Sequence, residues 1–390
     1  MQLKNNKIVI IGSGMAAYML AQNIRQESAD IDITIIAERD GRFYPKPMLS
    51  TALFHKKTPS DIETASSNEM MSKYAINIMT NQKVHEIDRK NQSVILSEQT
   101  VHYDKLVLAV GSIANEIPNI SPTDGYVSIN AIEDYEVLLQ KLDQAKKILV
   151  IGSGLVGVEF AHDLLQSGYE VSMVSQDVSA LWPLIPREIG IVCRDHLISR
   201  GLDWFVDKGV IGLKSNHDQI TVQFSEHPEK TYDLVLSAIG IKPRIELAKA
   251  ANLDINLGIV TDAWGKTNDP NIYALGDCAE IHGLVLTYVA PIKQQALAIA
   301  KSLTGNKTKI SYPPMPVVVK MPTFPLTLVP VRQVHPTGEW CMHQNDENDG
   351  LIAGFYHPEK GLQGFVLAGP ATRLRNEWLK KMPESILDSA

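Results

Sequence analysis

Apolar residues along this chain fall into short uninterrupted runs, separated by segments in which apolar positions recur with helical spacing. The run from Ile8 to Ile11 has four apolar residues in succession, which is typical of a strand buried on both faces of a parallel sheet. A glycine-containing turn follows, and residues 15–26 have the spacing of an amphipathic helix. The segment IDITIIA at 31–37 is typical of a second strand and completes a strand–turn–helix–strand unit.

This unit occurs twice. The segment IVIIGSGMAAYMLAQNIRQ, which begins at Ile8, returns as ILVIGSGLVGVEFAHDLLQSG from Ile148, 140 positions later. Two copies of one such unit predict two mononucleotide-binding cores, whereas a solenoid would need many short repeats. The predicted fold class is therefore α/β, with two Rossmann-like, doubly wound dinucleotide-binding domains.

The rest of the chain extends these two domains and adds a third. Strand patterns at 106–112 and 234–240 are followed by a helical pattern at 294–303. From about Ser311 onward, prolines interrupt short β-rich stretches, which predicts a smaller C-terminal α+β domain. We expect a discontinuous first domain at 1–112 and 241–312, a second domain at 113–240, and the C-terminal domain at 313–390.

The first glycine turn has the composition of a pyrophosphate-binding loop. Gly12 allows the tight turn, Gly14 lets the backbone approach a pyrophosphate at the helix N-terminus, and Ala17 takes the third glycine position. Glu38 ends the second strand, where a carboxylate can accept hydrogen bonds from an adenosine ribose. A tight turn in an unrelated α/β protein is the alternative, and the context of strand, helix and acid favours dinucleotide binding.

The second turn repeats the pattern with Gly152, Gly154 and Gly157. Glu159 follows on the first turn of the helix, which would aim it toward a nicotinamide, although a solvated helix residue would look the same in sequence. The strand after this helix ends without the ribose acid, since Asp177 comes one step late. No arginine stands at the strand end for a 2′-phosphate, so we expect NADH to be preferred over NADPH.

Three later positions fit a bound dinucleotide. Gly111 and Gly240 lie at strand ends where the chain would cross between domains, and Asp277 follows a glycine at the end of the segment NIYALGD. A carboxylate there can bind the ribityl hydroxyls of a flavin, whereas an isolated Asp would more often cap a helix. Together with two glycine turns, the flavin interpretation is favoured.

Composition narrows the function further. A net charge of -7 with no basic run argues against nucleic acid, and three cysteines without a C-x-x-C pair build neither a disulfide framework nor a thiolate zinc site. The eleven histidines show no metal-ligand spacing, so we expect no metal centre. The polar start leads directly into a strand, and no stretch approaches the roughly 20 apolar residues of a membrane helix. These features suit a cytoplasmic protein without stable membrane insertion.

On these motifs the chain resembles the FAD-dependent pyridine nucleotide reductase superfamily over nearly its whole length. The segment YPKPMLS at 44–50 has Lys46 and Pro47 where disulfide reductases carry a cysteine pair and peroxide- or oxygen-reducing relatives carry one cysteine. Together with VVVKMPTFPL at 317–326, it looks most like the rubredoxin–NAD reductases, including those that supply alkane hydroxylases. The resemblance implies that electrons leave directly from the flavin, without a thiol relay.

The resemblance also implies roles for individual residues. Lys46 and Lys320 would lie against the isoalloxazine, where Lys320 would stabilise the negative charge of reduction and Lys46 would hold the N5 side or pair with Glu159. The implied catalytic residues are therefore Lys46, Lys320 and Glu159. The implied cofactor-binding residues are Gly12, Ser13, Gly14, Met15, Ala17, Glu38, Arg39, Lys46, Val84, Gly111, Gly152, Gly154, Gly157, Glu159, Gly240, Asp277, Val289 and Lys320.

The implied partner is rubredoxin or a similar small iron electron carrier. Such partners are acidic, so we expect a local basic rim, with Arg42, Arg332 and Arg373 as candidates. Two other functions remain open at this stage: a type II NADH–quinone reductase, and a sensor that binds dinucleotides without turnover. The run at 373–382 is either a membrane-surface helix, as the quinone reductase would need, or a capping helix before Pro383, which its short apolar face favours.

Overall fold

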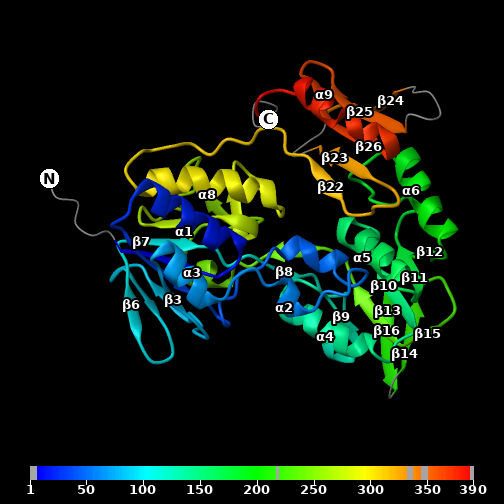
Figure 1. The fold of residues 1–390 in the computed structure, drawn as a ribbon, viewed down its shortest axis with the longest axis horizontal. Coiled ribbons are helices and arrows are strands. Elements are labelled where there is room, and N and C mark those ends of the chain that lie inside the picture. Colours follow the sequence, from blue (N-terminus) through cyan, green and yellow to red (C-terminus); the bar gives the residue numbers. More distant parts are fainter. Residues whose placement is uncertain (1–6, 217–218, 332–336, 344–349, 387–390) are drawn as a thin grey trace. The chain divides into compact units, whose positions relative to one another are not determined.

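The computed structural model describes residues 7–216, 219–331, 337–343 and 350–386, which form two compact units (Figure 1). The first unit consists of Met1–Pro45, Glu63–Ile113 and Lys242–Tyr312. The second consists of Lys46–Ile62, Ala114–Ile241 and Pro313–Ala390. Each unit therefore combines segments that are far apart in the sequence.

A five-stranded parallel sheet forms the centre of the first unit, with the strand order β19-β7-β1-β2-β3. Its strands are β1 (Lys7–Ile11), β2 (Asp32–Ile36), β3 (Asn77–Met79), β7 (Lys105–Leu108) and β19 (Ile272–Ala274). In the central strand β1, Ile8, Val9 and Ile10 are completely buried, as the uninterrupted apolar run predicts. This order is that of a mononucleotide-binding half of a doubly wound fold.

Helices α1 (Met15–Glu27) and α8 (Val289–Leu303) pack side by side in this unit (Figure 1). At the start of each helix, the N-cap residue makes no side-chain hydrogen bond to the backbone N–H groups of the first turn. The other described helices of this unit are α3 (Ser67–Tyr74), α7 (Glu246–Ala250) and the short η3 (Gly276–Cys278). Small sheets complete the unit, with strands β4 (Glu86–Asp88), β5 (Ser93–Ile95), β6 (Thr100–His102), β18 (Ile259–Thr261), β20 (Ala279–Ile281) and β21 (Leu284–Val285).

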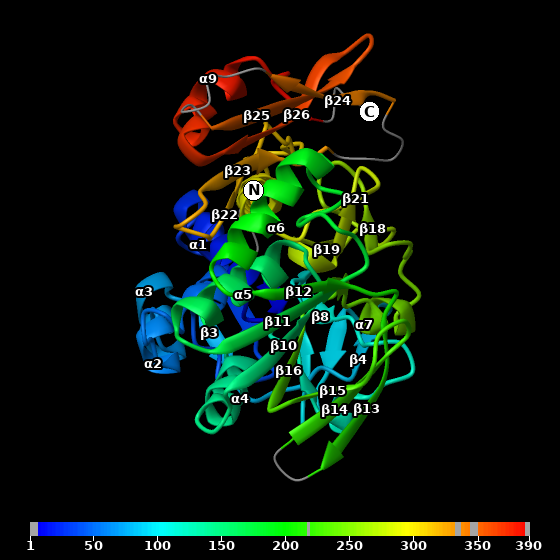
Figure 2. The same ribbon diagram turned by 90° about the vertical axis from the view of Figure 1, so that its right-hand side faces the viewer.

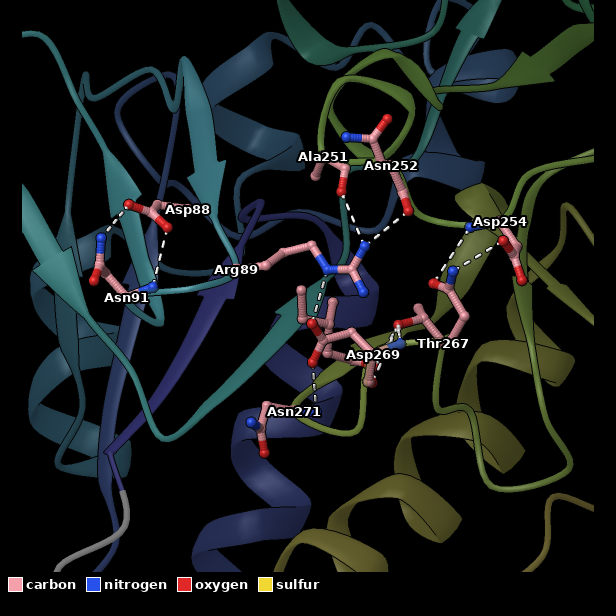
Figure 3. A network of polar contacts seen from close by, with 11 residues as sticks. Asp88, Arg89, Asn91, Ala251, Asn252, Asp254, Thr267, Asp269 and Asn271 are labelled. Atoms are coloured by element: carbon pink, nitrogen blue, oxygen red, sulfur yellow. Dashed lines mark hydrogen bonds and ion pairs between the residues drawn. The ribbon is translucent and has the colours of Figure 1, made fainter.

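A polar network connects two of the three chain segments of the first unit (Figure 3). Arg89, directly after β4, donates to the Asp269 carboxylate at 2.8 Å and to the carbonyl oxygens of Asn252 at 2.8 Å and Ala251 at 3.3 Å. One guanidinium group thus satisfies three acceptors that lie more than 160 positions away in the chain. The network stabilises the association of residues 63–113 with 242–312.

The second unit contains another five-stranded parallel sheet, with the order β12-β11-β10-β16-β9. Its strands are β9 (Tyr126–Val127), β10 (Lys147–Ile151), β11 (Glu170–Ser175), β12 (Asp203–Val206) and β16 (Leu234–Ser237). Its helices are η1 (Lys46–Thr51), α2 (Pro59–Ile62), η2 (Pro122–Asp124), α4 (Ile132–Leu142), α5 (Leu155–Gln166) and α6 (Arg187–Ser199). An antiparallel sheet of β13 (Val210–Asn216), β14 (Gln219–Phe224) and β15 (Lys230–Tyr232) adjoins it. The repeat in the sequence is therefore a repeat of topology.

The C-terminal part of the second unit is an antiparallel sheet with the order β22-β23-β26-β25-β24 (Figure 2). Its elements are β22 (Val317–Val319), β23 (Leu326–Val329), β24 (Glu339–His343), β25 (Leu351–His357), β26 (Gly361–Ala368), η4 (Gly369–Leu374) and α9 (Arg375–Lys380). Trp378 of α9 is 4% exposed and packs against Phe365 and Leu367, so this helix covers the sheet. Two Rossmann-like domains and a small α+β region confirm the predicted fold class. Among the described residues, no helix is long and apolar enough to cross a membrane.

Candidate functional site

The first glycine turn has the geometry that a pyrophosphate needs. Gly12 has φ +111°, and a Cβ at this position would lie 2.3 Å from the Ala109 carbonyl oxygen, so only glycine fits. Gly14 is the N-cap of α1, and a Cβ there would meet no atom within 4 Å. The approach to the uncapped helix N-terminus is therefore open. These residues fit an anion such as the pyrophosphate of a dinucleotide.

The turn that carries Asp277 is fixed by two neighbouring elements. Gly276, just before it, donates its N–H to the Gln295 side chain of α8 at 2.7 Å, and Gln295 is itself 1% exposed. Asp277 lies in η3 (Gly276–Cys278) and accepts a hydrogen bond from the Ser112 hydroxyl at 2.9 Å. A Cβ on Gly276 would come within 2.9 Å of Ala16 in α1, so the turn lies close to the first glycine loop. The carboxylate and the loop can serve one ligand.

Glu38, the predicted ribose acid, lies two residues beyond the end of β2 at Ile36. Its side chain is 52% exposed and faces two cations, Arg244 at 3.2 Å and Lys83 at 3.6 Å. Exposed pairs of this kind contribute only about 0–1 kcal/mol, so the carboxylate can exchange these partners for ribose hydroxyls. Arg244 was not predicted, because it lies more than 200 positions from Glu38 in the sequence.

The second glycine turn repeats the geometry of the first within the other unit. A Cβ on Gly152, which has φ +100°, would lie 2.7 Å from the Ala238 carbonyl oxygen, and a Cβ on Gly157 would lie 2.0 Å from that of Gly152. Gly154 caps α5 and again faces open space. The second unit therefore also fits a dinucleotide pyrophosphate.

Glu159 lies at the centre of a buried polar cluster in the second unit. The side chain is 5% exposed, and its carboxylate accepts hydrogen bonds from the Ser50 hydroxyl at 2.6 Å and from the backbone N–H of Lys320 at 2.9 Å. The Lys320 ammonium group forms an ion pair with the same carboxylate. Three hydrogen-bond donors therefore face this buried carboxylate and offset the cost of removing it from water. Two of the three predicted catalytic residues thus contact each other directly.

The strand β11 ends in an arrangement that the sequence did not reveal. Asp177 accepts a hydrogen bond from the Ser179 N–H at 2.9 Å and forms an ion pair with Arg187 at 2.6 Å. Arg187 also lies over the Trp182 ring, 4.6 Å from its centroid. An arginine therefore does lie near the strand end, although it comes ten positions later in the sequence. Its charge is compensated by Asp177.

The other predicted residues are distributed over both units. Lys46 begins η1 and is partly exposed, Val289 begins α8, and Arg39 and Val84 lie in loops after β2 and β3. The remaining glycines both have positive φ, +70° at Gly111 and +94° at Gly240.

The candidate docking arginines differ in their surroundings. Arg42 is paired with Asp40 at 2.6 Å, and Arg332 lies outside the described residues. Arg373 belongs to η4 and, together with Arg375, lines an open cavity of about 490 Å³ beside β22 and β23. The residues that line this cavity are Val318, Pro325, Leu326, Thr327, Thr372, Arg373, Arg375 and Asn376. The described lining of this cavity therefore includes two arginines and no carboxylate.

The cysteines are poor candidates for a thiol relay. Cys193 and Cys278 are completely buried, and burial raises the pKa of the Cys278 thiol to about 11. The thiolate is the reactive form, so such a thiol is unreactive near neutral pH. Cys341, in β24, is only partly buried, and none of the three forms a disulfide.

Comparison with known proteins gives consistent matches over nearly the whole chain. The chain is 34% identical to the rubredoxin-NAD(+) reductase of Alcanivorax borkumensis, with 96% of this chain and 98% of that protein covered. It is 35% identical to the nitric oxide reductase FlRd-NAD(+) reductase of Klebsiella pneumoniae, with 93% and 95% covered. The crystal structure of a ferredoxin reductase from Rhodopseudomonas palustris has the same fold, with a TM-score of 0.86 at 24% identity and 97% and 96% coverage.

Family models divide the chain into two parts. The model of the rubredoxin binding C-terminal domain matches residues 309–382, and that of the pyridine nucleotide-disulphide oxidoreductases matches residues 6–297. Together with the relatives, these matches confirm the predicted resemblance, the oxidoreductase class and the use of FAD and a nicotinamide dinucleotide. They argue against a sensor without turnover. By the match over residues 6–297, the chain belongs to the pyridine nucleotide-disulphide oxidoreductase family.

Proposed function

We propose that this protein transfers electrons from NADH through FAD to rubredoxin. The observation that carries the proposal is the combination of two open glycine turns, in separate parallel sheets, with a rubredoxin-binding domain at 309–382. When bound, FAD supplies the ability to accept a hydride and to release electrons singly to an iron centre. The chain itself provides binding, positioning and electrostatic stabilisation.

The first unit is proposed to bind FAD. The turn at Gly12–Gly14 and the start of α1 as far as Ala17 would hold the pyrophosphate. Glu38, Arg39 and Val84 would bind the adenosine, and Asp277 the ribityl chain. Two observations support this assignment: the open helix start at Gly14, and the fixed orientation of the turn that carries Asp277. Val289 would offer its N–H to the flavin pyrimidine, because α8 begins there without a side-chain cap. Gly111 would allow close passage of the chain.

The second unit is proposed to bind NADH at Gly152, Gly154 and Gly157, with Gly240 at the neighbouring strand end. A preference for NADH over NADPH is supported by the Asp177–Arg187 pair, since the carboxylate compensates the charge of an arginine near the strand end. A 2′-phosphate would have to compete with this carboxylate. The proposed domain boundaries are those expected from the sequence: FAD at 1–112 and 241–312, NADH at 113–240, and the rubredoxin-binding region at 313–390. Within the first of these ranges, Lys46–Ile62 belongs to the second compact unit.

Lys320, Lys46 and Glu159 are proposed to serve catalysis. Reduction places negative charge on the flavin, and a fixed cation stabilises that charge without reorganisation. Lys320 suits this role because its ion pair with Glu159 and its backbone hydrogen bond to the same carboxylate fix the position of its side chain. Lys46 is proposed to provide the second cation. Glu159 would orient Lys320 and the nicotinamide.

The test is a stopped-flow measurement on the purified yellow protein. NADH should bleach the flavin rapidly, and added rubredoxin should restore its colour. Lys320→Ala should lower the flavin midpoint potential and slow turnover, whereas unchanged values would refute the catalytic assignment. A colourless protein that takes up no flavin, or rapid flavin reduction without any electron transfer to rubredoxin, would contradict the proposed function.

A second acceptor is favoured by the relatives whose name includes FlRd-NAD(+) reductase, at 33% and 35% identity. A FlRd-type protein should therefore be included in the panel of acceptors beside rubredoxin. We also propose that reduced rubredoxin supplies an alkane hydroxylase, and that the protein works in the cytoplasm, where its thiols stay reduced. A reconstituted system of the protein, rubredoxin and hydroxylase should oxidise an alkane with NADH.

A further inference from the structure

Helix α5 holds two other parts of the second unit through buried polar side chains. Glu159, His162 and Asp163 are 4%, 5% and 3% exposed and lie within four positions on this helix. Residues four positions apart on a helix lie on the same face, so Glu159 and Asp163 point to the same side. The helix starts at Gly154, the open turn proposed for NADH.

Asp163 fixes the segment Lys46–Ile62. One carboxylate oxygen accepts the Leu53 N–H at 2.9 Å, and the other accepts the Phe54 N–H at 3.2 Å. Glu159, one turn earlier, accepts the Ser50 hydroxyl. The segment is therefore held at two points along α5, and Lys46 lies four residues before Ser50 in the short helix η1.

His162 fixes the second lysine-bearing segment. Its Nε2 lies 2.8 Å from the Thr323 hydroxyl oxygen, and Nε2 of His196 in α6 lies 2.9 Å from the same atom. A hydroxyl group has one proton to donate, so one imidazole donates to Thr323 and the other accepts. Burial lowers the pKa of both histidines, aided by the charge of Arg200, which keeps both rings neutral. Thr323 follows Lys320 by three residues, so this segment is also held at two points.

We propose that His162 and Asp163 are positioning residues, which fix the segments that carry Lys320 and Lys46 on the helix that begins at the NADH-binding turn. The inference rests on the proposed function, because it takes the two lysines as catalytic. Neither residue contributes to the chemistry itself. Each acts by restricting the positions of a lysine through hydrogen bonds to the chain beside it.

The pKa of Asp163 allows its positioning role to be tested by changing the pH. Burial raises the pKa of this carboxyl group to about 6, against the opposing effect of the two amides and the nearby His55, while Glu159 raises it further. Tyr135 faces the carboxylate from α4. As the pH falls through about 6, one carboxylate oxygen gains a proton and becomes a weaker acceptor for the amide N–H bound to it. The two amide hydrogen bonds favour the charged carboxylate and should weaken over that range, whereas burial of the carboxyl group favours its neutral form.

Asp163→Asn provides the main experiment on the FAD-loaded protein. Amide hydrogen exchange at Leu53 and Phe54 should accelerate about tenfold, as expected for the loss of roughly one hydrogen bond of stabilisation. The rate constant of flavin reduction by NADH should fall severalfold, and its decline below pH 6 in the parent should disappear. Thr323→Val removes the hydrogen bonds of Thr323 with His162 and His196 and should shift the flavin midpoint potential.

The matched control is Asp233→Asn. Asp233 also accepts hydrogen bonds from two consecutive backbone N–H groups, those of Lys146 and Lys147, each at 2.8 Å. These bonds involve neither the segment that carries Lys46 nor the one that carries Lys320. This variant should leave flavin reduction, its pH profile and the midpoint potential unchanged. If it slows flavin reduction as much as Asp163→Asn does, the proposed positioning role is wrong.

Two further outcomes decide the inference. Unchanged exchange at Leu53 and Phe54 in Asp163→Asn would overturn it, as would faster exchange with an unaltered reduction rate and pH profile. If Asp163→Asn does not fold, an unaltered midpoint potential in Thr323→Val overturns it instead. Failure of the parent protein to reduce rubredoxin would contradict only the proposed function. The exchange measurement tests the hydrogen bonds from Leu53 and Phe54 to Asp163 without relying on rubredoxin reduction.

Discussion

Replacing Lys320 by methionine measures how far the buried Glu159 carboxylate depends on one ammonium group. The carboxylate side chain is 5% exposed and that of the lysine 32%. Methionine keeps much of the stem and leaves the carboxylate with its hydrogen bonds from the Ser50 hydroxyl and the backbone N–H. Removing one partner of a buried pair costs about 3–5 kcal/mol. Because the lysine is partly exposed and two donors remain, we expect the free energy of unfolding to fall by about 2 kcal/mol.

The assay follows unfolding of the second unit alone. Trp264 is the single tryptophan in the segments of the first unit, so tryptophan fluorescence in a Trp264→Phe background reports the second. Adding Glu159→Gln to Lys320→Met should recover at least half of the lost stability, since a neutral amide needs no counter-ion. Lys381→Met is the control: its exposed pair with Glu377 should contribute less than about 0.5 kcal/mol.

Two results would refute this account of the pair. One is a Lys320→Met protein as stable as the parent, which would mean that the carboxylate does not need the ammonium group. The other is a double variant no more stable than the single one. The fall in stability would then come from lost packing of the lysine stem rather than from an uncompensated charge.

Three further predictions concern other parts of the chain. Burial and the charge of Arg200 lower the pKa of His162 to about 4. The free energy of unfolding should therefore fall by up to roughly 3 kcal/mol as the pH decreases from 6.5 toward 4, because the unfolded chain binds the proton more readily. In His162→Gln, unfolding curves of the second unit should show a smaller loss over this range. Arg89→Met should destabilise the first unit by about 2–3 kcal/mol in thermal unfolding, because the Asp269 carboxylate and two carbonyl groups lose their donor, and an unchanged melting temperature would contradict this. Asp177→Ala should free the Arg187 guanidinium for a 2′-phosphate and lower KM for NADPH several-fold relative to NADH; an unaltered ratio would show that Arg187 does not reach the nucleotide.

The sequence predicted the features that depend on local pattern. The duplicated strand–turn–helix unit appears as two sheets of the same strand order, and Gly12 and Gly152 occupy backbone positions that exclude any side chain. Such positions can be recognised because residue type and backbone geometry are tied within a few residues. The small antiparallel C-terminal region was likewise indicated by its prolines and short strands.

Features made by distant segments were not predictable. The sequence left open whether Lys46 pairs with Glu159. In the structure, Glu159 forms an ion pair with Lys320, which lies 161 positions away in the chain. The same holds for Arg187 beside Asp177, where spacing along the strand suggested that no arginine was present. Long-range partners are chosen by the packing of whole elements, and a single sequence carries no direct record of that packing.

The discontinuity of the first unit has a consequence for synthesis of the chain. Its sheet gains β19 and its helix α8 only from Lys242–Tyr312, after all of Ala114–Ile241 has been made. At roughly 5–20 residues per second, translation leaves the early strands without these neighbours for on the order of ten seconds. During that interval apolar strand residues such as Val107 lack their later cover on the ribosome. Nascent chains of this protein should therefore depend on chaperones more than those of a contiguous Rossmann domain.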